Sequence, residues 1–144
     1  MPQKNVDKEY YENAVYHVYN RGAAGSIVFQ DDTDFWVFRR IARLKMKKMS
    51  GVIMISPFNI LPNHFHLKVW QENSRDMEHL MRSVMTAFGK YYRGRHGGSG
   101  RVFETPYKAR YIEKKEEEMR LDKYILRNHI EMGLLNWKHF GYKI

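Results

Sequence analysis

Cysteine is absent from the 144-residue chain, and proline is scarce, with four residues. Without cysteine there is no disulfide, no thiolate zinc site and no cysteine nucleophile, so any metal ion must be held by histidine and oxygen ligands. The chain also lacks a bilayer-length apolar run: the N-terminal residues contain no hydrophobic stretch, and the aliphatic run 52–55 is far too short. We therefore expect a cytoplasmic protein without membrane contact.

Negative charge is in short supply, because 25 Lys and Arg outnumber 16 Asp and Glu to leave a net charge of +9. This excess predicts a polyanionic partner. A composition of 43% hydrophobic and 28% charged residues is that of an ordinary globular protein. With no internal repeat, we expect one domain over residues 1–144, with a polar tail at 1–13 and a mobile glycine-rich loop at 94–101.

Hydrophobic periodicity and turn residues divide the chain into alternating strands and helices. The first predicted elements are a strand over 14–22, a segment 26–30 that extends the pairing of this strand, and a helix from 31–34 to Gly51. Two strands follow, one over 52–61 with an edge or bulge at Pro57 and one over 64–70, and then a helix over about 74–93. The last elements are a strand region over 102–112, broken by Pro106, and a helix from about 116 to Gly133. This order predicts an α+β fold, ferredoxin-like or RRM-like, with helices packed on an antiparallel sheet.

Two histidines occur on the most regular of these strands. In the segment 64–70 residues alternate, which places Phe65, Leu67 and Val69 on one face and His64 and His66 on the other. Two imidazoles on one face of a strand can bind one metal ion. The alternative is that this polar face is simply exposed to solvent, as in many antiparallel sheets.

A tyrosine and an asparagine are four residues apart on the last predicted helix. Tyr124 and Asn128 therefore share a helix face, with Arg127 adjacent. A phenol is mostly protonated at neutral pH and is a weak nucleophile unless a metal ion or cations stabilise its phenolate. Tyr92 and His96 have the same spacing, so the pattern alone leaves the choice open.

Five motifs, taken in order, resemble those of a known family. The chain is similar over roughly residues 14–135 to the single-tyrosine transposases of the HUH nuclease superfamily, most of all the REP-associated tyrosine transposases. The motifs are YHVYNRG at 16–22, VFQDDTD at 28–34, LPNHFHLKV at 61–69, HLMRSVMTAFGKYYRGRHGGSGRVF at 79–103 and YILRN at 124–128.

The resemblance implies a function and a set of site residues. His64 and His66, on a central strand, would be metal ligands, Asn128 the third ligand, and Tyr124 the nucleophile. The implied activity is transposition of single-stranded, hairpin-forming DNA through a 5′-phosphotyrosine intermediate, with Mg²⁺ or Mn²⁺ as cofactor. The implied partner is single-stranded DNA with palindromic hairpin ends, at the nucleoid, and the protein would act as a monomer or a homodimer.

The sequence departs from the family pattern at two positions. Relatives usually have proline after the asparagine and methionine before the proline of the histidine motif, whereas this chain has His129 and Leu61. We expect His17 to be a structural residue or to contact a metal ligand rather than to be one. The remaining histidines are expected at the surface: His79, His96, His129 and His139.

Basic residues near these motifs are the predicted contacts to DNA phosphates. They are Arg21, Arg82, Lys90, Arg93, Arg95, Lys108, Arg110 and Arg127. Two alternatives remain: a non-catalytic single-stranded nucleic-acid-binding module with an RRM-like sheet, and a metal-dependent phosphodiesterase that uses activated water.

Overall fold

The structure, a computed structural model, describes residues 10–144, so residues 1–9 of the predicted polar tail lie outside the described part. The elements in chain order are β1 (Ala14–Arg21), the short 3₁₀ helix η2 (Ala23–Gly25), α1 (Asp32–Lys47), β2 (Ile53–Leu61), β3 (His64–Gln71), α2 (Asp76–His96), β4 (Lys108–Ile112), α3 (Lys115–Glu131) and β5 (Phe140–Gly141). Among these described helices, none has the length and apolar character that a membrane span needs.

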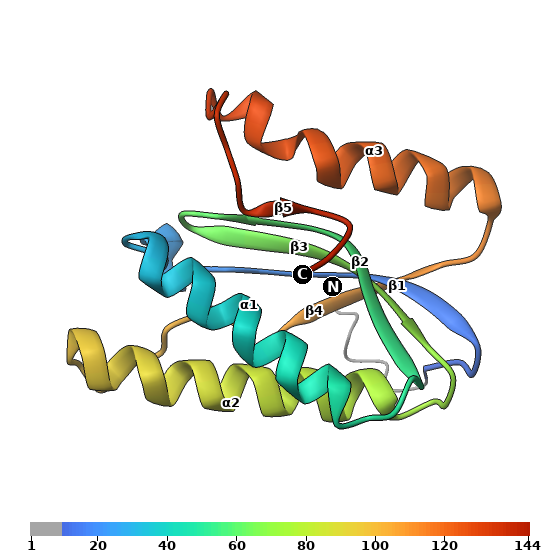
Figure 1. Ribbon diagram of the computed structural model, residues 1–144, viewed down its shortest axis with the longest axis horizontal. Coiled ribbons are helices and arrows are strands. Elements are labelled where there is room, and N and C mark those ends of the chain that lie inside the picture. The colour runs from blue at the N-terminus through green and yellow to red at the C-terminus, as the bar shows by residue number, and fades with distance from the viewer. Residues whose placement is uncertain (1–9) are drawn as a thin grey trace.

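The strands form one antiparallel sheet in the order β4-β1-β3-β2-β5. Figure 1 shows three layers, with α1 and α2 on one side of the sheet and α3 on the other. The predicted α+β, ferredoxin-like architecture is confirmed, and β3, which carries the histidine pair, is the central strand. The two-residue edge strand β5 was not predicted.

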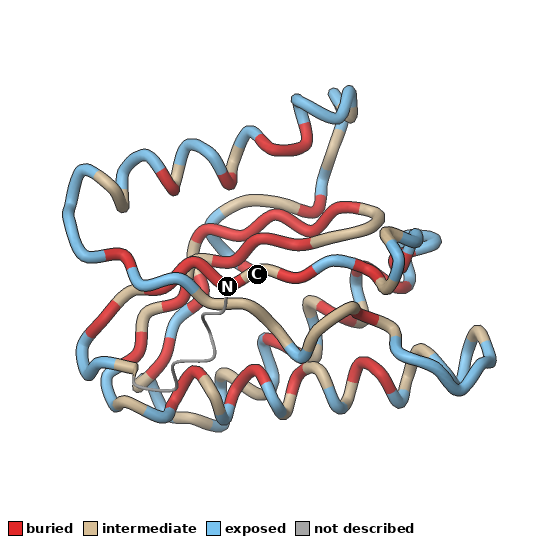
Figure 2. Tube along the Cα trace, turned by 180° about the vertical axis from the view of Figure 1, so that it is seen from behind, coloured by how far each residue is buried: buried red, intermediate tan, exposed pale blue. Residues whose placement is uncertain are grey.

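The core lies between the sheet and the α1–α2 layer. Phe65 and Val69 of β3 are fully buried there, together with Phe38 of α1 and Phe88 of α2. The ring centroid of Phe38 lies 5.1 Å from that of Phe65 and 5.2 Å from that of Phe88. The buried segments in Figure 2 follow the inner strands and the sheet-facing sides of the helices, so the alternation predicted for 64–70 is confirmed.

The interruption predicted at Pro57 is confirmed as a register shift between Ile55 and Phe58, where β2 bulges against β3. The predicted extension of strand pairing by residues 26–30 is wrong. Instead, the backbone N–H groups of Val28 and Phe29 both donate to the Pro62 carbonyl, at 2.8 and 2.9 Å. The segment therefore packs against the turn between β2 and β3 and does not pair along a strand.

Two element boundaries differ from the prediction. The strand expected over 102–112 is regular only from Lys108, and before it Phe103 makes a single bridge to Gly22. Helix α2 continues to His96, inside the predicted glycine-rich loop. The reason for the longer helix is a partner distant in sequence, because Arg95 and His96 both bind Asp34 at the start of α1.

Two histidines expected at the surface are buried, one within α3 and one after it. His139 has no exposed surface; its Nε2 lies 3.2 Å from Asp32 Oδ1, and its ring stacks on Phe35 at 4.4 Å. His129, near the end of α3, is also buried. His96 is half-buried, whereas His79 is exposed as expected.

The carboxylate of Asp34 connects α1 to α2. It is fully buried, and it accepts hydrogen bonds from the Gln30 backbone N–H at 2.9 Å and from Arg95 Nη1 at 2.8 Å. It also accepts from the Tyr91 hydroxyl and lies 2.9 Å from His96 Nε2. Burial alone would raise the pKa of Asp34, but these hydrogen bonds outweigh it and lower the pKa.

Replacing Asp34 by asparagine should therefore destabilise the fold. Asp34→Asn keeps the shape but removes the charge, so we expect the free energy of unfolding in urea at pH 7 to fall by about 2–3 kcal/mol. Asp31→Asn is the matched control: Asp31 also pairs with Arg95, but it is exposed and asparagine still caps a helix, so the loss should stay below about 1 kcal/mol. Equal losses would contradict this role of Asp34.

Candidate active site

Helix α3 covers part of the sheet face opposite the core, and an ion-pair cluster fixes its first half. Lys68 of β3 donates to Glu118 at 2.7 Å and contacts Asp122 at 2.8 Å, with its side chain 13% exposed. Burial opposes the charge of Lys68, but its hydrogen bonds to Asp122 and Glu118 outweigh this effect and raise its pKa. Beside this cluster, Leu121 and Ile125 pack on Ile112.

A second polar contact fixes the other half of α3. Asn59 of β2 donates through Nδ2 to the Ile125 carbonyl at 2.8 Å, and the same atom lies 3.0 Å from His129 Nδ1. The His129 ring packs on Phe140 of β5 at 4.1 Å. His129 was expected at the surface, but this contact to Asn59, the cross-strand neighbour of His66, buries it.

His64 and Asn128 direct two acceptor atoms at one point. His64 Nδ1 lies 2.7 Å from the Asn63 side-chain oxygen, which can only accept, so this contact favours the tautomer with its proton on Nδ1. His64 Nε2 then has a free lone pair, and it lies 3.0 Å from Asn128 Oδ1. Two lone pairs facing each other are stabilised by a cation between them, so the arrangement fits a metal ion.

The distance between these two atoms, His64 Nε2 and Asn128 Oδ1, fits two ligands of a small octahedral ion. Adjacent ligands of Mg²⁺, at about 2.0–2.1 Å from the ion, are about 2.8–3.0 Å apart, and the observed separation between Nε2 and Oδ1 is 3.0 Å. Within residues 10–144 there is no group of three His, Asp or Glu side chains that could hold a metal. A site here therefore depends on the carboxamide of Asn128 as well as the two imidazoles.

His66 lies next to His64 on the same face, with 5.1 Å between ring centroids. Its Nδ1 is 2.9 Å from Nε2 of His17 on β1, which leaves Nε2 of His66 available as a ligand atom. Burial, followed by the charges of His17 and His64, lowers the pKa of His66 to about 3. Burial, followed by the charge of Arg110, lowers the pKa of His17 to about 4. Both rings are neutral at pH 7, as metal ligation requires.

Tyr124 projects from α3 beside this pair. Its ring centroid lies 5.2 Å from that of His66 and 6.1 Å from that of His17, edge to face in both cases. The side chain is 45% exposed, so its hydroxyl is accessible to a large substrate. Tyr92, the alternative in the sequence, belongs to α2 in the opposite layer, where it accepts a hydrogen bond from Gln30.

The basic residues predicted to contact DNA divide between the two sides of the sheet. On the side of the histidine pair are Arg21, Lys108, Arg110 and Arg127; the first two bind Glu104, and Arg110 binds Glu117 at 2.7 Å. The others are on α2, in the opposite layer: Arg82, Lys90, Arg93 and Arg95. Arg95 is held by Asp31 and Asp34.

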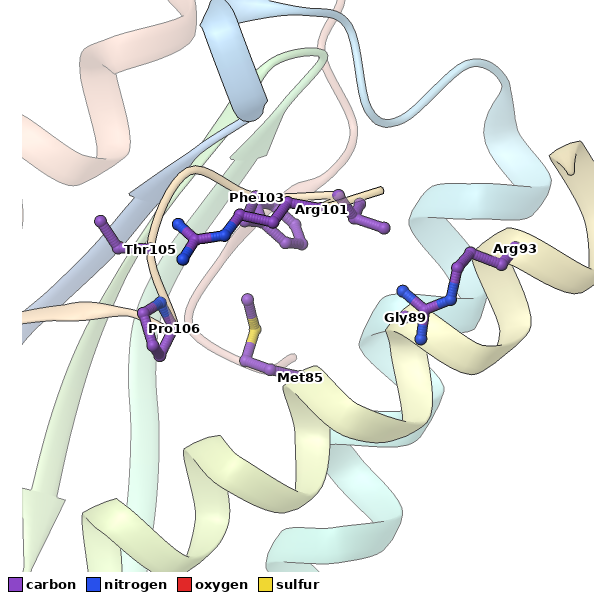
Figure 3. A pocket seen from close by; sticks show the side chains of 8 residues that line it. Met85, Gly89, Arg93, Arg101, Phe103, Thr105 and Pro106 are labelled. Atoms are coloured by element: carbon purple, nitrogen blue, oxygen red, sulfur yellow. The ribbon is translucent and has the colours of Figure 1, made fainter. Parts of the chain in front are cut away.

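A small cavity of about 250 Å³ lies between α2 and the segment before β4. Figure 3 shows Arg93 on the α2 side and Arg101 on the opposite wall, with Phe103, Thr105 and Pro106 along the same segment. None of its lining residues borders the histidine pair, so this basic cavity is separate from the candidate active site.

Several residues of the site were not predicted from the sequence. Asn63 contacts His64, and Asn59 contacts α3. Tyr19 and Arg120 line a cleft beside Tyr124. Alternation along β1 could have found Tyr19, since it shares a strand face with His17. No sequence signal connects Asn59 to Ile125 and His129 of α3, which are 66 and 70 positions away.

The lowered pKa values of His17 and His66 predict how metal-free stability depends on pH. In the unfolded chain both should titrate near 6.5, so the unfolded state binds more protons between that pH and the folded values of about 4 and 3. Stability then falls as pH drops through this window, by about 1–2 kcal/mol per histidine between pH 6.5 and 4.5. Urea unfolding in EDTA measures the slope. His17→Gln should make it shallower, and an unchanged slope would contradict the assignment.

No protein-family model and no curated protein sequence matches the chain. Several solved structures do match, and two of them share the fold over most of the chain. A REP-associated tyrosine transposase bound to a REP hairpin has a TM-score of 0.70 and 16% sequence identity, over 94% of this chain and 77% of that one. A candidate transposase from Deinococcus radiodurans R1 has a TM-score of 0.54 and 13% identity, over 87% of this chain and 95% of that one. The chain therefore has the fold of a REP-associated tyrosine transposase.

Proposed function

We propose that the protein is a single-tyrosine DNA transposase of the HUH type, acting on single-stranded, hairpin-forming DNA. The observation that carries the proposal is the position of Tyr124 beside His66, on the sheet face where His64 and Asn128 direct donor atoms at one point. A nucleophile, two imidazoles and a carboxamide oxygen are groups that metal-assisted transesterification can use.

In the proposed reaction, the Tyr124 oxygen loses its proton and attacks the scissile phosphorus in line. A bond forms between the tyrosine oxygen and phosphorus, and the bond from phosphorus to the 3′-oxygen breaks. The 3′-oxygen takes up a proton and leaves as a hydroxyl, while a 5′-phosphotyrosine remains. Attack by another 3′-hydroxyl reverses these bond changes on a new strand, so no nucleotide is hydrolysed.

His64, His66 and Asn128 would hold a divalent ion, which would polarise the scissile phosphate and stabilise its developing charge. Mg²⁺ or Mn²⁺ suits the carboxamide and phosphate oxygens, although two imidazoles would also accept zinc. The protein's own contribution is positioning. His17 orients His66 through its ring nitrogen, Asn63 fixes the proton of His64, and α3 carries both Tyr124 and Asn128.

The proposed substrate is single-stranded DNA with palindromic hairpin ends, at the nucleoid. The structural neighbour described above is bound to a hairpin, and the net charge of +9 favours a polyanion. Basic side chains on the face of Tyr124 would contact the phosphates of the strand to be cleaved: Arg21, Lys108, Arg110 and Arg127.

The proposed reaction is complete within one chain, because Lys68 and Asn59 hold α3 on its own sheet. The protein would then act as a monomer. A homodimer in which α3 moves to the partner's sheet is the alternative, and it would have to break these buried contacts.

Replacing the proposed nucleophile separates transposase from the alternative functions. Wild-type protein incubated with a labelled single-stranded hairpin and Mn²⁺ should form a covalent adduct on a denaturing gel. Tyr124→Phe should lose both adduct and cleavage, because only the hydroxyl is removed. Tyr92→Phe, which changes a tyrosine in the opposite layer, is the matched control and should keep both.

Other outcomes of this experiment would reject the proposal. Cleavage that survives Tyr124→Phe would indicate a phosphodiesterase using activated water, and binding without any adduct across varied flanking sequences would indicate a non-catalytic RRM-like module. Mixing Tyr124→Phe protein with His66→Ala protein tests for the exchanged helix, since adduct would form in the mixture only if α3 can serve a partner's sheet.

The ligand role of Asn128 can be tested without DNA. Asn128→Ala should weaken Mn²⁺ binding to the free protein by roughly tenfold or more, because one of three protein ligands is lost. Titration followed by Mn²⁺ electron paramagnetic resonance measures the affinity. Asn136→Ala, in an exposed position after α3, is the control and should leave it unchanged. Equal affinity in both variants would remove Asn128 from the ligand set.

A further inference from the structure

A cleft of about 510 Å³ opens beside Tyr124 and runs toward the edge strand β4. Its volume lies within the range of small-ligand sites, roughly 300–1,000 Å³, so one nucleotide unit fits. The residues that line it come from β1, β3, β4 and α3: His17, Tyr19, His66, Arg110, Glu117, Arg120, Leu121 and Tyr124. It is therefore continuous with the proposed reaction centre.

Tyr19 provides an aromatic wall of the cleft at a fixed position. It lies in the middle of β1, paired with His66 on one side and Lys108 on the other. Its ring packs on His17, with 4.7 Å between centroids, and lies nearly parallel to His66 at 6.3 Å. A half-buried ring held by two neighbours loses little conformational freedom when a ligand stacks on it.

Positive charge surrounds this ring. Arg110 and Arg120 line the cleft, and Lys108 Nζ lies 6.0 Å from the centre of the Tyr19 ring. Two carboxylates offset part of this charge: Glu117 binds Arg110 at 2.7 Å, and Glu104 binds Lys108 at 3.2 Å. The three cations still outnumber the two acids, so the cleft favours a ligand that combines a flat ring with negative charge, which is the chemistry of an unpaired nucleotide.

We propose that this cleft binds the nucleotide next to the scissile phosphate, with its base stacked on Tyr19 and its phosphate near Arg120 and Arg110. The inference rests on the proposed function, because the cleft is assigned to a nucleotide beside the scissile phosphate through Tyr124, which lines it. It adds a base-binding subsite and a reason for single-strand preference: a base that enters the cleft cannot stay paired or stacked on its neighbours.

An abasic scan tests the subsite in equilibrium binding. With protein carrying Tyr124→Phe, which cannot react, removing one base at a time from a single-stranded ligand should weaken binding most at one position adjoining the scissile phosphate, by about tenfold. Adding Tyr19→Leu should weaken binding of intact DNA by a similar factor and abolish the penalty at that position alone. Adding Tyr19→Phe, which keeps the ring, should preserve the penalty at that position.

A second variant keeps the test decisive if Tyr19→Leu does not fold. Arg120→Gln, at an exposed position of α3, should weaken binding at all sequences and reduce the dependence of log Kd on log salt by about one unit. Arg40→Gln, exposed on α1 in the opposite layer, is the control and should change neither.

The two proposals can fail separately. A penalty at one position that persists unchanged in Tyr19→Leu, or an Arg120→Gln variant that behaves like Arg40→Gln, would overturn the subsite while adduct formation by Tyr124 could still stand. A Tyr19-dependent abasic penalty in a protein that never forms an adduct would support the subsite and reject the transposase.

Discussion

The seating of α3 on the open face of the sheet is the constraint on which the site depends. Tyr124 and Asn128 belong to this helix, whereas His64 and His66 belong to β3, so the two pairs meet only while the helix stays in place. Lys68 fixes one end, and Asn59 with His129 fixes the other. Polar contacts suit this task better than apolar ones alone, because their geometry selects a single helix register.

The two faces of the sheet differ in what they contact. Phe65 and Val69 on one face build the core with α1 and α2, while His64, His66 and Lys68 of the same strand face α3 on the other. This division lets a buried, rigid strand place ligand atoms to within a fraction of an ångström, which loops rarely achieve. His17 and Tyr19 on β1 extend the face that carries the histidine pair toward β4.

Sequence reasoning succeeded where local patterns carry the information. Strand alternation placed His64 and His66 on a face opposite Phe65, and helical spacing placed Tyr124 with Asn128; the fold class followed from element order. Sequence reasoning failed where a residue distant in sequence determines the local structure or the burial. Residues 26–30 bind the Pro62 carbonyl, α2 is extended by contacts to Asp34, and His129 is buried by Asn59, none of which leaves a local signature.

The low exposure of Lys68 has a consequence for interpreting ionic strength. Dissolved salt screens charges in open solvent far more than charges inside the protein, and the Lys68 side chain is 13% exposed. Added salt should therefore disrupt contacts between surface arginines and a phosphate chain well before it loosens α3. For this molecule, a loss of affinity for the proposed DNA substrate in concentrated electrolyte would report on the number of counterions displaced, with the position of α3 on the sheet still intact.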